Sequence, residues 1–329
     1  MTNPSTPQIT VDVHLAPGGP LSGMAADVRA GLTKPFKELS PRYFYDERGS
    51  ELFEQITELP EYYPTRCERE ILERDSAEIV STAGDPATLI ELGSGSAAKT
   101  RVLLDAMRDA GCLDAYAPVD ISEEITRETA GAIASEYAIT VHGLVCDFER
   151  DLERMPLGGP RVIALLGGTI GNFEPAQRAS FLARVANLLG DDDHFLLGTD
   201  LVKDRATLEA AYNDSAGVTA EFNKNVLTVM NRELDADFDV DAFDHVAFFD
   251  REREWIEMRL RATSRQRVHV GALGLDVEFE PREELRTEIS AKFTFDRLQG
   301  DLAAAGLELE RVFTDDDDLF ALSLSRPAG

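Results

Sequence analysis

Thr88-Leu-Ile-Glu-Leu-Gly-Ser-Gly-Ser-Ala-Ala-Lys99 is the stretch that decides the fold. Its apolar start is typical of a buried strand. Gly93 and Gly95 then predict a tight turn, because glycine lacks a Cβ and accepts a positive φ. Residues 97–107 are compatible with a helix. Strand, glycine turn and helix in this order hold an adenosine-bearing ligand against the main chain of α/β proteins. Since Gly93, Gly95 and Ala98 also satisfy the dinucleotide pattern, the turn alone leaves the ligand open.

The next predicted strands end in residues suited to different parts of such a ligand. The second strand ends in Asp120, an acid that can bind ribose hydroxyls. The third ends in Asp147 and Phe148, which offer a carboxylate to an adenine amino group and a ring to stack on it. The fourth opens into Gly167-Gly-Thr-Ile-Gly-Asn172. These strands are predicted over residues 113–119, 139–145 and 161–166.

The complete series favours S-adenosylmethionine (SAM) as the ligand. SAM has an adenosine and an amino-acid tail but no pyrophosphate, and Lys99 is placed to meet its carboxylate. A nicotinamide or flavin cofactor needs only the first two strand ends and leaves Asp147 and Asn172 without a role. It stays open as the alternative at this point.

Composition and charge narrow the location and the partners. The chain has 329 residues and a formal net charge of −28, which argues against a nucleic acid or an anionic membrane as partner. Residues 1–20 resemble no signal peptide, and no apolar run approaches the roughly 20 residues that span a bilayer. Three scattered cysteines, Cys67, Cys112 and Cys146, predict no disulfide framework. We expect a cytoplasmic monomer that acts on a small molecule.

A metal site is not expected from the histidines. None of them stands at helical or zinc-ligand spacing from another. They are His14, His142, His194, His245 and His269.

The pattern of elements predicts an α/β protein with a second, α+β part. Residues 68–200 and 293–329 read as a Rossmann-like sheet with its helices, which we expect to bind SAM. Residues 20–67 and 201–292 do not fit that sheet, and we expect them to form a substrate-binding domain that roofs the cofactor site. Residues 1–19 are expected to be a disordered tail.

Local signals predict more of the second part. The helix before Pro60 is expected to begin at Ser50, a good N-cap, and Thr65-Arg-Cys-Glu68 reads as a capping box for the next helix. Residues 204–233 read as helices. Trp255–Arg261 and Gln266–Val270 read as two strands of one hairpin.

Longer motifs point together to one family. They are Phe44-Tyr-Asp46, Gly49-Ser-Glu-Leu-Phe53, Pro60-Glu-Tyr-Tyr-Pro-Thr-Arg66, Glu91-Leu-Gly-Ser-Gly95, Gly167-Gly-Thr-Ile-Gly-Asn172, Gly198-Thr-Asp-Leu-Val-Lys-Asp204, Ala220-Glu-Phe-Asn-Lys-Asn225, Asn231-Arg-Glu-Leu234 and Thr287-Glu-Ile-Ser290. On these motifs the chain, from about residue 20 onward, closely resembles the SAM-dependent histidine Nα-methyltransferases of bacterial ergothioneine biosynthesis.

The resemblance implies a fold, an activity and a set of site residues. The fold is a Rossmann-like class I SAM-dependent methyltransferase sheet over residues 68–200 and 293–329, with a second α+β substrate-binding domain. The activity is the transfer of three methyl groups from SAM to the α-amino nitrogen of L-histidine, which gives hercynine. Tyr45 and Asn172 are implied as the residues next to the substrate amine. The implied cofactor residues are Gly93, Lys99, Asp120, Asp147 and Phe148, and the implied substrate residues are Tyr62, Gly167, Asn172, Tyr212, Met258, Glu288 and Ser290.

Three other readings are weighed against this one. A sister methyltransferase for another aromatic amino acid should lack the acid that Glu288 supplies. A dinucleotide oxidoreductase and a SAM-binding regulator without activity are the other two. For Glu288 itself, the competing reading is a structural ion pair with a nearby arginine such as Arg286.

Overall fold

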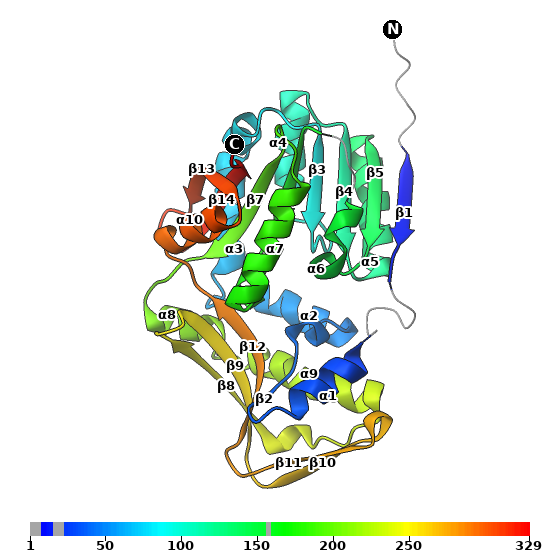
Figure 1. Ribbon diagram of the computed structural model, residues 1–329, viewed down its shortest axis with the longest axis vertical. Coiled ribbons are helices and arrows are strands. Elements are labelled where there is room, and N and C mark those ends of the chain that lie inside the picture. Colours follow the sequence, from blue (N-terminus) through cyan, green and yellow to red (C-terminus); the bar gives the residue numbers. More distant parts are fainter. Residues whose placement is uncertain (1–7, 16–22, 156–158) are drawn as a thin grey trace.

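The computed structural model describes residues 8–15, 23–155 and 159–329, and in this part of the chain an eight-stranded sheet lies above a four-stranded one (Figure 1). The larger sheet has the order β1-β5-β4-β3-β6-β7-β14-β13. Its first six strands are parallel, whereas β14 is antiparallel to both of its neighbours. The strands are β1 (Ile9–Val13), β3 (Thr88–Leu92), β4 (Ala115–Asp120), β5 (Thr140–Val145), β6 (Arg161–Leu165), β7 (His194–Asp200), β13 (Leu307–Thr314) and β14 (Phe320–Pro327).

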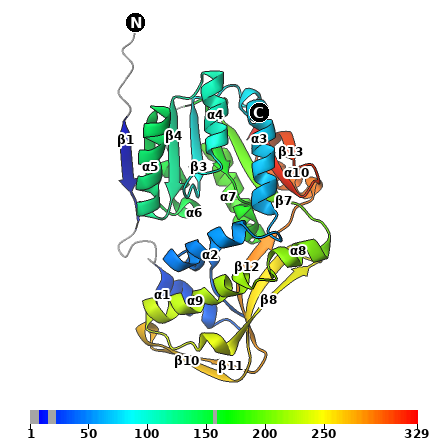
Figure 2. The same ribbon diagram turned by 180° about the vertical axis from the view of Figure 1, so that it is seen from behind.

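Helices cover both faces of this sheet. For that reason a central strand such as β6 is buried along its whole length and reads as an apolar run. One group of helices lies in front in Figure 2 and the other in Figure 1. The first group is α3 (Pro64–Thr82), α4 (Arg101–Ala110) and α5 (Glu123–Tyr137), and the second is α6 (Phe148–Asp151), α7 (Pro175–Leu188) and α10 (Phe295–Ala304).

The second part of the molecule is built around a smaller sheet of order β2-β12-β9-β8. Helix α9 (Val218–Leu234) packs on β8 and β9, and α2 packs on α9. A separate hairpin, β10–β11, lies at the end of the molecule farthest from the large sheet (Figure 1). The other elements are α1 (Met24–Leu32), β2 (Lys37–Glu38), η2 (Pro41–Phe44), α2 (Glu47–Thr57), α8 (Arg205–Ala211), β8 (Phe243–Asp250), β9 (Trp255–Ala262), β10 (Gln266–Val270), β11 (Leu275–Phe279) and β12 (Glu284–Ala291).

The two parts meet where β12 returns to the large sheet. Phe293 forms a parallel bridge with Leu201, just after β7, and its carbonyl accepts a hydrogen bond from the Val202 N–H at 2.9 Å. The carboxyl ends of β3, β4 and β5 point toward the second part in Figure 1. In open α/β sheets ligands bind beyond this edge.

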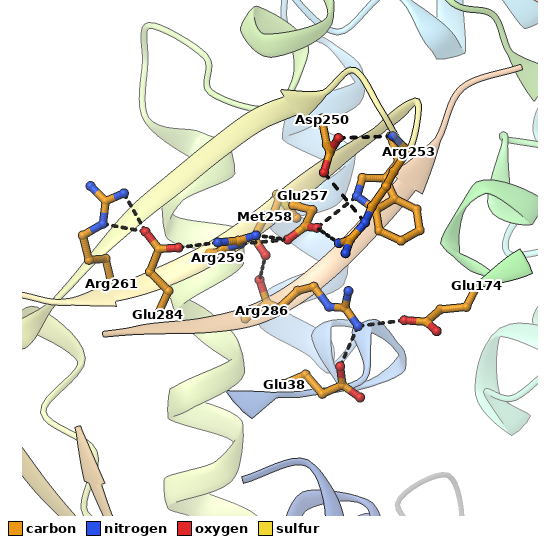
Figure 3. Close-up of polar contacts among 12 residues, drawn as sticks. Glu38, Glu174, Asp250, Arg253, Glu257, Met258, Arg259, Arg261, Glu284 and Arg286 are labelled. Carbon is orange, nitrogen blue, oxygen red and sulfur yellow. Dashed lines mark hydrogen bonds and ion pairs between the residues drawn. The ribbon is translucent and has the colours of Figure 1, made fainter. Parts of the chain in front are cut away.

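Charged side chains line the face of the smaller sheet that is turned away from α9 (Figure 3). Glu284 on β12 pairs with Arg259 at 2.5 Å and with Arg261 at 2.6 Å, and Arg259 also pairs with the fully buried Glu257. Alternate residues of a strand point to opposite faces. Met258 and Leu260 of β9 therefore point the other way, into the core.

Three predictions about the N-terminal region are wrong. Ile9–Val13, assigned to a disordered tail, is strand β1 and pairs in parallel with β5, while the rest of 1–19 apart from residues 8, 14 and 15 lies outside the described residues. Helix α2 begins at Glu47, because Asp46 caps it by accepting the Gly49 N–H at 2.8 Å. Helix α3 begins with Pro64, without a side-chain cap.

The predicted hairpin is also wrong in its pairing. Strand β9 pairs with β8 and β12, whereas β10 pairs with β11. Residues 243–250 form β8. No strand is predicted there, because Asp244 and His245 interrupt the apolar pattern. In residues 8–15, 23–155 and 159–329, every helix is too short or too polar to cross a membrane.

Candidate active site

The glycine turn after β3 lies against the end of β4. Gly93 and Gly95 have φ values of 71° and 49°, which a residue with a side chain rarely adopts. Asp120, the last residue of β4, accepts the Gly95 N–H with one carboxylate oxygen and the Ser122 N–H with the other, each at 3.0 Å. Asp120 therefore holds the turn in place, and its carboxylate keeps further lone pairs for a ligand.

Asp147 and Phe148 follow the next strand and lie close to the same turn. The Phe148 ring is 3.7 Å from the position that a Cβ on Gly93 would occupy. Asp147 caps α6 by accepting the Glu149 N–H at 3.1 Å. Its carboxylate also pairs at 3.4 Å with Arg42, which comes from η2 in the other part of the molecule. This strand end thus joins the two parts electrostatically.

Glu91 lies below the turn rather than at its surface. Its side chain is buried and accepts hydrogen bonds of 2.5 Å from the hydroxyls of Thr100 and Tyr116. Burial raises the pKa of the Glu91 carboxyl to about 7, although both hydrogen bonds act to lower it. Glu91 therefore connects β3 to β4 and to the start of α4, and it has no surface to offer a ligand.

Lys99 is held by an acid that the sequence analysis did not assign to the site. Glu68 on α3 is fully buried and forms an ion pair with Lys99. Its other carboxylate oxygen accepts the Gly167 N–H at 2.6 Å. The carboxylate thus joins the predicted cofactor lysine to the loop after β6. Glu68 lies on the face of α3 that also carries Ile71 and Leu72, so its position in the helical period was the available signal.

The residues of the T-E-x-S motif lie on the inner face of the smaller sheet. Glu288 is directly opposite Met258 in the pairing of β12 with β9, so their side chains lie side by side. Ser290 is two residues further along and shares this face. The strand register shifts between Arg286 and Glu288, and such a bulge redirects the side chains that follow it.

Three tyrosines from separate elements gather around Glu288. The rings of Tyr62 and Tyr212 are 6.4 Å apart between centroids. Tyr45 is 51% exposed, yet burial raises its pKa, with the charges of Glu288 and Tyr212 adding to the effect. Burial raises the pKa of Tyr62 and Tyr212 as well, so all three phenols stay protonated at neutral pH.

Asn172 is the last residue of η4 (Thr169–Asn172), which joins β6 to α7. Its amide donates to the Ile289 carbonyl of β12 at 2.9 Å. The neighbouring Gly171 packs so tightly on Ala291 that a Cβ there would come within 2.9 Å of a carbonyl oxygen. These contacts place Asn172 between the cofactor edge and the inner face of the smaller sheet.

A buried charged network supports this face from below. Asp200, at the end of β7, pairs with Lys292 at 2.7 Å and with Lys203, and it accepts the Tyr63 hydroxyl at 2.8 Å. Burial alone would raise the pKa of Asp200, but the two ammonium groups hold it below its usual value. Burial lowers the pKa of Lys203 to about 8. Lys292, which is fully buried, then reaches Ser290.

Glu288 is the acid whose pKa matters most for this face. Burial raises the pKa of its carboxyl to about 7, against the lowering effects of the Lys292 charge and of a hydrogen bond from Asn172. Arg286 is engaged elsewhere, with Glu38 at 2.6 Å and Glu174 at 2.8 Å. Among the described residues no arginine or lysine lies within ion-pair distance of Glu288, so the structural ion-pair reading is wrong.

The fold and the cofactor edge together define a class of protein. The parallel strands β5-β4-β3-β6-β7 are followed in the sheet by β14, which is antiparallel to both of its neighbours, and then by β13. The glycine turn, Asp120 and Asp147 lie at one edge of this sheet. This is the arrangement of a class I SAM-dependent methyltransferase.

Comparison with known proteins gives the family. The model of the family of histidine-specific, SAM-dependent methyltransferases matches residues 24–327, and the chain belongs to this family. It is 51% identical to the histidine N-alpha-methyltransferase of Mycobacterium tuberculosis over 97% of this chain and 99% of that one. The enzyme of the same name from Mycolicibacterium smegmatis is also 51% identical, over 95% and 97%. The ergothioneine biosynthesis protein 1 of Neurospora crassa is 37% identical over 59% of this chain and 23% of that one.

Proposed function

We propose that the protein methylates the α-amino nitrogen of L-histidine three times, which forms hercynine for ergothioneine biosynthesis. The observation that carries the proposal is the pair of Glu288 and Ser290, a carboxylate and a hydroxyl side by side on the inner face of β12. A neutral imidazole has one N–H donor and one acceptor nitrogen, and these two groups can bind them. The names of the mycobacterial relatives agree with it.

In this proposal the two parts of the chain divide the ligands between them. Residues 68–200 and 293–329 bind SAM, and residues 20–67 and 201–292 bind the amino acid. Asp120 binds the ribose hydroxyls, Asp147 and Phe148 bind the adenine, and Gly93 lets the cofactor approach the main chain. The methionine carboxylate meets Lys99, whose ammonium Glu68 already holds in place.

The substrate is held at both ends. Tyr62 binds the α-carboxylate, and Gly167 lines the same site. Tyr212 and Asn172 accept hydrogen bonds from the α-amino group, since the Tyr212 proton already goes to Ser290 and an N–H of Asn172 to Ile289. Glu288 and Ser290 bind the imidazole, with Met258 packing beside Glu288. Tyr45 lies near the amine. The contacts at the α-carboxylate and the imidazole hold the substrate independently of the reacting nitrogen. After each transfer and loss of a proton, the amine can therefore turn and present its lone pair again.

The chemistry needs orientation more than a strong base. SAM supplies a methyl group on a positively charged sulfur, and each transfer forms one N–C bond, breaks one S–C bond and releases a proton. An α-amino group ordinarily has a pKa of about 8, so a usable fraction is neutral near that pH. Tyr45 and Asn172 then direct its lone pair, and alignment alone can supply effective molarities of roughly 10⁵–10⁸ M.

A panel experiment tests the proposed function. The purified protein is incubated with SAM and each of histidine, tryptophan, phenylalanine and tyrosine. We expect mass gains of one, two and three methyl groups on histidine, with three molecules of S-adenosylhomocysteine formed for each hercynine. Preferred methylation of tryptophan would favour the sister activity, and SAM binding without any product would favour a regulator.

Asp120→Asn tests the cofactor half. The change removes the charge that strengthens hydrogen bonds from the ribose, so we expect SAM to bind about tenfold more weakly, equivalent to roughly 1.4 kcal/mol. Titration calorimetry measures this affinity. Asparagine is preferred to alanine because its amide oxygen can still accept one of the two N–H groups, of Gly95 and Ser122, that Asp120 holds with its two oxygens.

The matched control is Asp109→Asn on the exposed end of α4, where the carboxylate pairs with Arg108. Its SAM affinity should equal that of the wild type. If Asp120→Asn also bound SAM like the wild type, Asp120 would not contact the ribose.

A further inference from the structure

Lys292 is a buried residue that the proposed function leaves without a role. It follows β12, is fully buried, and lies two residues beyond Ser290 on the same face. Its ammonium group is 2.7 Å from Asp200, 2.8 Å from the Ser290 hydroxyl and 3.0 Å from the Tyr212 hydroxyl. A lysine ammonium has three N–H donors, and these contacts use all of them. Lys292 therefore has no donor left for a substrate.

The consequence falls on Ser290. Its oxygen accepts one hydrogen bond from Lys292 and a second from the Tyr212 hydroxyl, at 2.8 Å each. A hydroxyl oxygen has two lone pairs and one proton. With both lone pairs used, Ser290 can act toward a ligand only as a donor. A serine hydroxyl without these two partners could rotate and either donate to a ligand or accept from it.

The same face therefore presents two groups of opposite character. Glu288, when ionised, only accepts hydrogen bonds. Ser290 already accepts from Lys292 and Tyr212, so toward a ligand it only donates. A neutral imidazole carries one N–H donor and one bare acceptor nitrogen. It fits this pair in a single orientation and a single tautomer.

We propose that Lys292 is a positioning residue that fixes Ser290 as a hydrogen-bond donor, so that the site selects the neutral imidazole with its N–H toward Glu288 and its bare nitrogen toward Ser290. The inference rests on the proposed function, with histidine as the substrate. It assigns the specificity for a ring acceptor nitrogen to a lysine that never touches the ring.

The chain offers a matched control in Lys203. Both lysines are paired with Asp200, but Lys203 contacts Tyr63 and neither Ser290 nor Tyr212. A variant at Lys203 removes the same charge from the same carboxylate. It leaves the hydrogen bonds that Ser290 accepts from Lys292 and Tyr212 unchanged.

The test compares histidine with a pyrrolylalanine in which CH replaces the acceptor ring nitrogen. The measured quantity is the ratio of kcat/KM for histidine to kcat/KM for the analogue. For the wild type we expect a ratio of at least about ten, because the analogue leaves the Ser290 donor unpaired. In Lys292→Met and in Ser290→Ala the ratio should fall toward one, and the double variant should fall no further.

Two more variants decide what the lysine does. Lys203→Met should keep the wild-type ratio. Lys292→Gln should restore much of it, since an amide can still donate to both hydroxyls. Equal losses in Lys203→Met and Lys292→Met would show an effect of charge at Asp200 and overturn the inference, as would a wild-type ratio in Lys292→Met.

Three further outcomes can be told apart from these. If Lys292→Met does not fold, as judged by thermal unfolding, the wild type and Ser290→Ala still decide whether Ser290 donates. A wild-type ratio near one overturns the inference while histidine methylation stands. A wild type that methylates neither compound refutes the proposed function itself.

Discussion

Glu288→Ala is expected to lower kcat/KM for histidine by about ten- to a hundredfold, while activity on tryptophan falls less or rises. A hydrogen bond from an imidazole N–H to a carboxylate is charge-assisted, and losing it costs roughly 1.5–3 kcal/mol of transition-state binding. An apolar aromatic ring would instead leave the carboxylate desolvated and unpaired. The acid should therefore favour histidine and disfavour its competitors at the same time.

The structure strengthens this expectation. Arg286, the arginine that would have paired with Glu288 in a structural role, is bound to Glu38 and Glu174. The neighbours of Glu288 are instead Met258 and the groups that face the predicted substrate. Burial already disfavours the charge of Glu288, so its removal should not destabilise the fold above pH 7.

Steady-state kinetics of both substrates, with thermal unfolding as a check, measure the effect. Glu284→Ala is the control, because Glu284 lies on the same strand but faces the arginines of the outer face. It should leave the preference for histidine over tryptophan unchanged. An equal loss on both substrates in Glu288→Ala would mean that the acid supports the fold and does not bind the imidazole.

The raised pKa of Glu288 adds a pH dependence to the same comparison. Its carboxyl is neutral below about pH 7 and ionised above it. The advantage of wild type over Glu288→Ala on histidine should therefore grow as the pH rises through 7 and then level off. Deprotonation of the substrate amine affects both enzymes and cancels in this ratio. A ratio that does not change with pH would exclude the ionised carboxylate as the acceptor.

The large sheet was predictable because its signals are local. Each βα unit repeats an apolar run, a polar strand end and a helix, and the glycine turn marks the first of them. Strand β8 and the pairing of β9 with β12 were not predictable in this way. They depend on contacts between residues far apart in the chain, which a local pattern does not encode. The short strand β1 was missed although Ile9, Val11 and Val13 alternate with polar residues, because prolines on both sides of it and glycines after it interrupt the segment, and because its partner β5 lies far away in the sequence.

Site residues could be named where a residue type and its place state a chemistry, or where a family motif supplies the role. Asp120 could be named from its carboxylate at a strand end, and Glu288 from the motif that the chain shares with the family; both roles stay predictions. Glu68 and Lys292 could not, since their importance comes from burial beside Lys99 and Ser290. A charged residue in a predicted helix or strand reads as solvated until packing shows that water is excluded.

The Asn172→Ala variant is expected to lower kcat/KM for histidine by about ten- to a hundredfold, through a higher KM or a lower kcat, with SAM affinity unchanged. The physical reason lies in how the amide is held. One N–H of Asn172 is bound to the Ile289 carbonyl at 2.9 Å, and this bond sets the plane of the amide. A hydrogen bond from Asn172 also acts on Glu288. The amide oxygen is then the group left to accept a hydrogen bond from an N–H of the substrate amine, which would turn the nitrogen lone pair toward the methyl group.

Calorimetric titration of SAM and kinetics with histidine separate the two halves of this prediction. Asn187→Ala, on the exposed side of α7, is the matched control and should change neither quantity. Asn172 lies on the short η4 helix, and Gly171 beside it is packed on Ala291, so the alanine variant should keep the path of the backbone. A loss of SAM binding with intact histidine binding would place Asn172 in the cofactor half of the site. The orientation of the amine would then have to come from Tyr45 and the other tyrosines around Glu288.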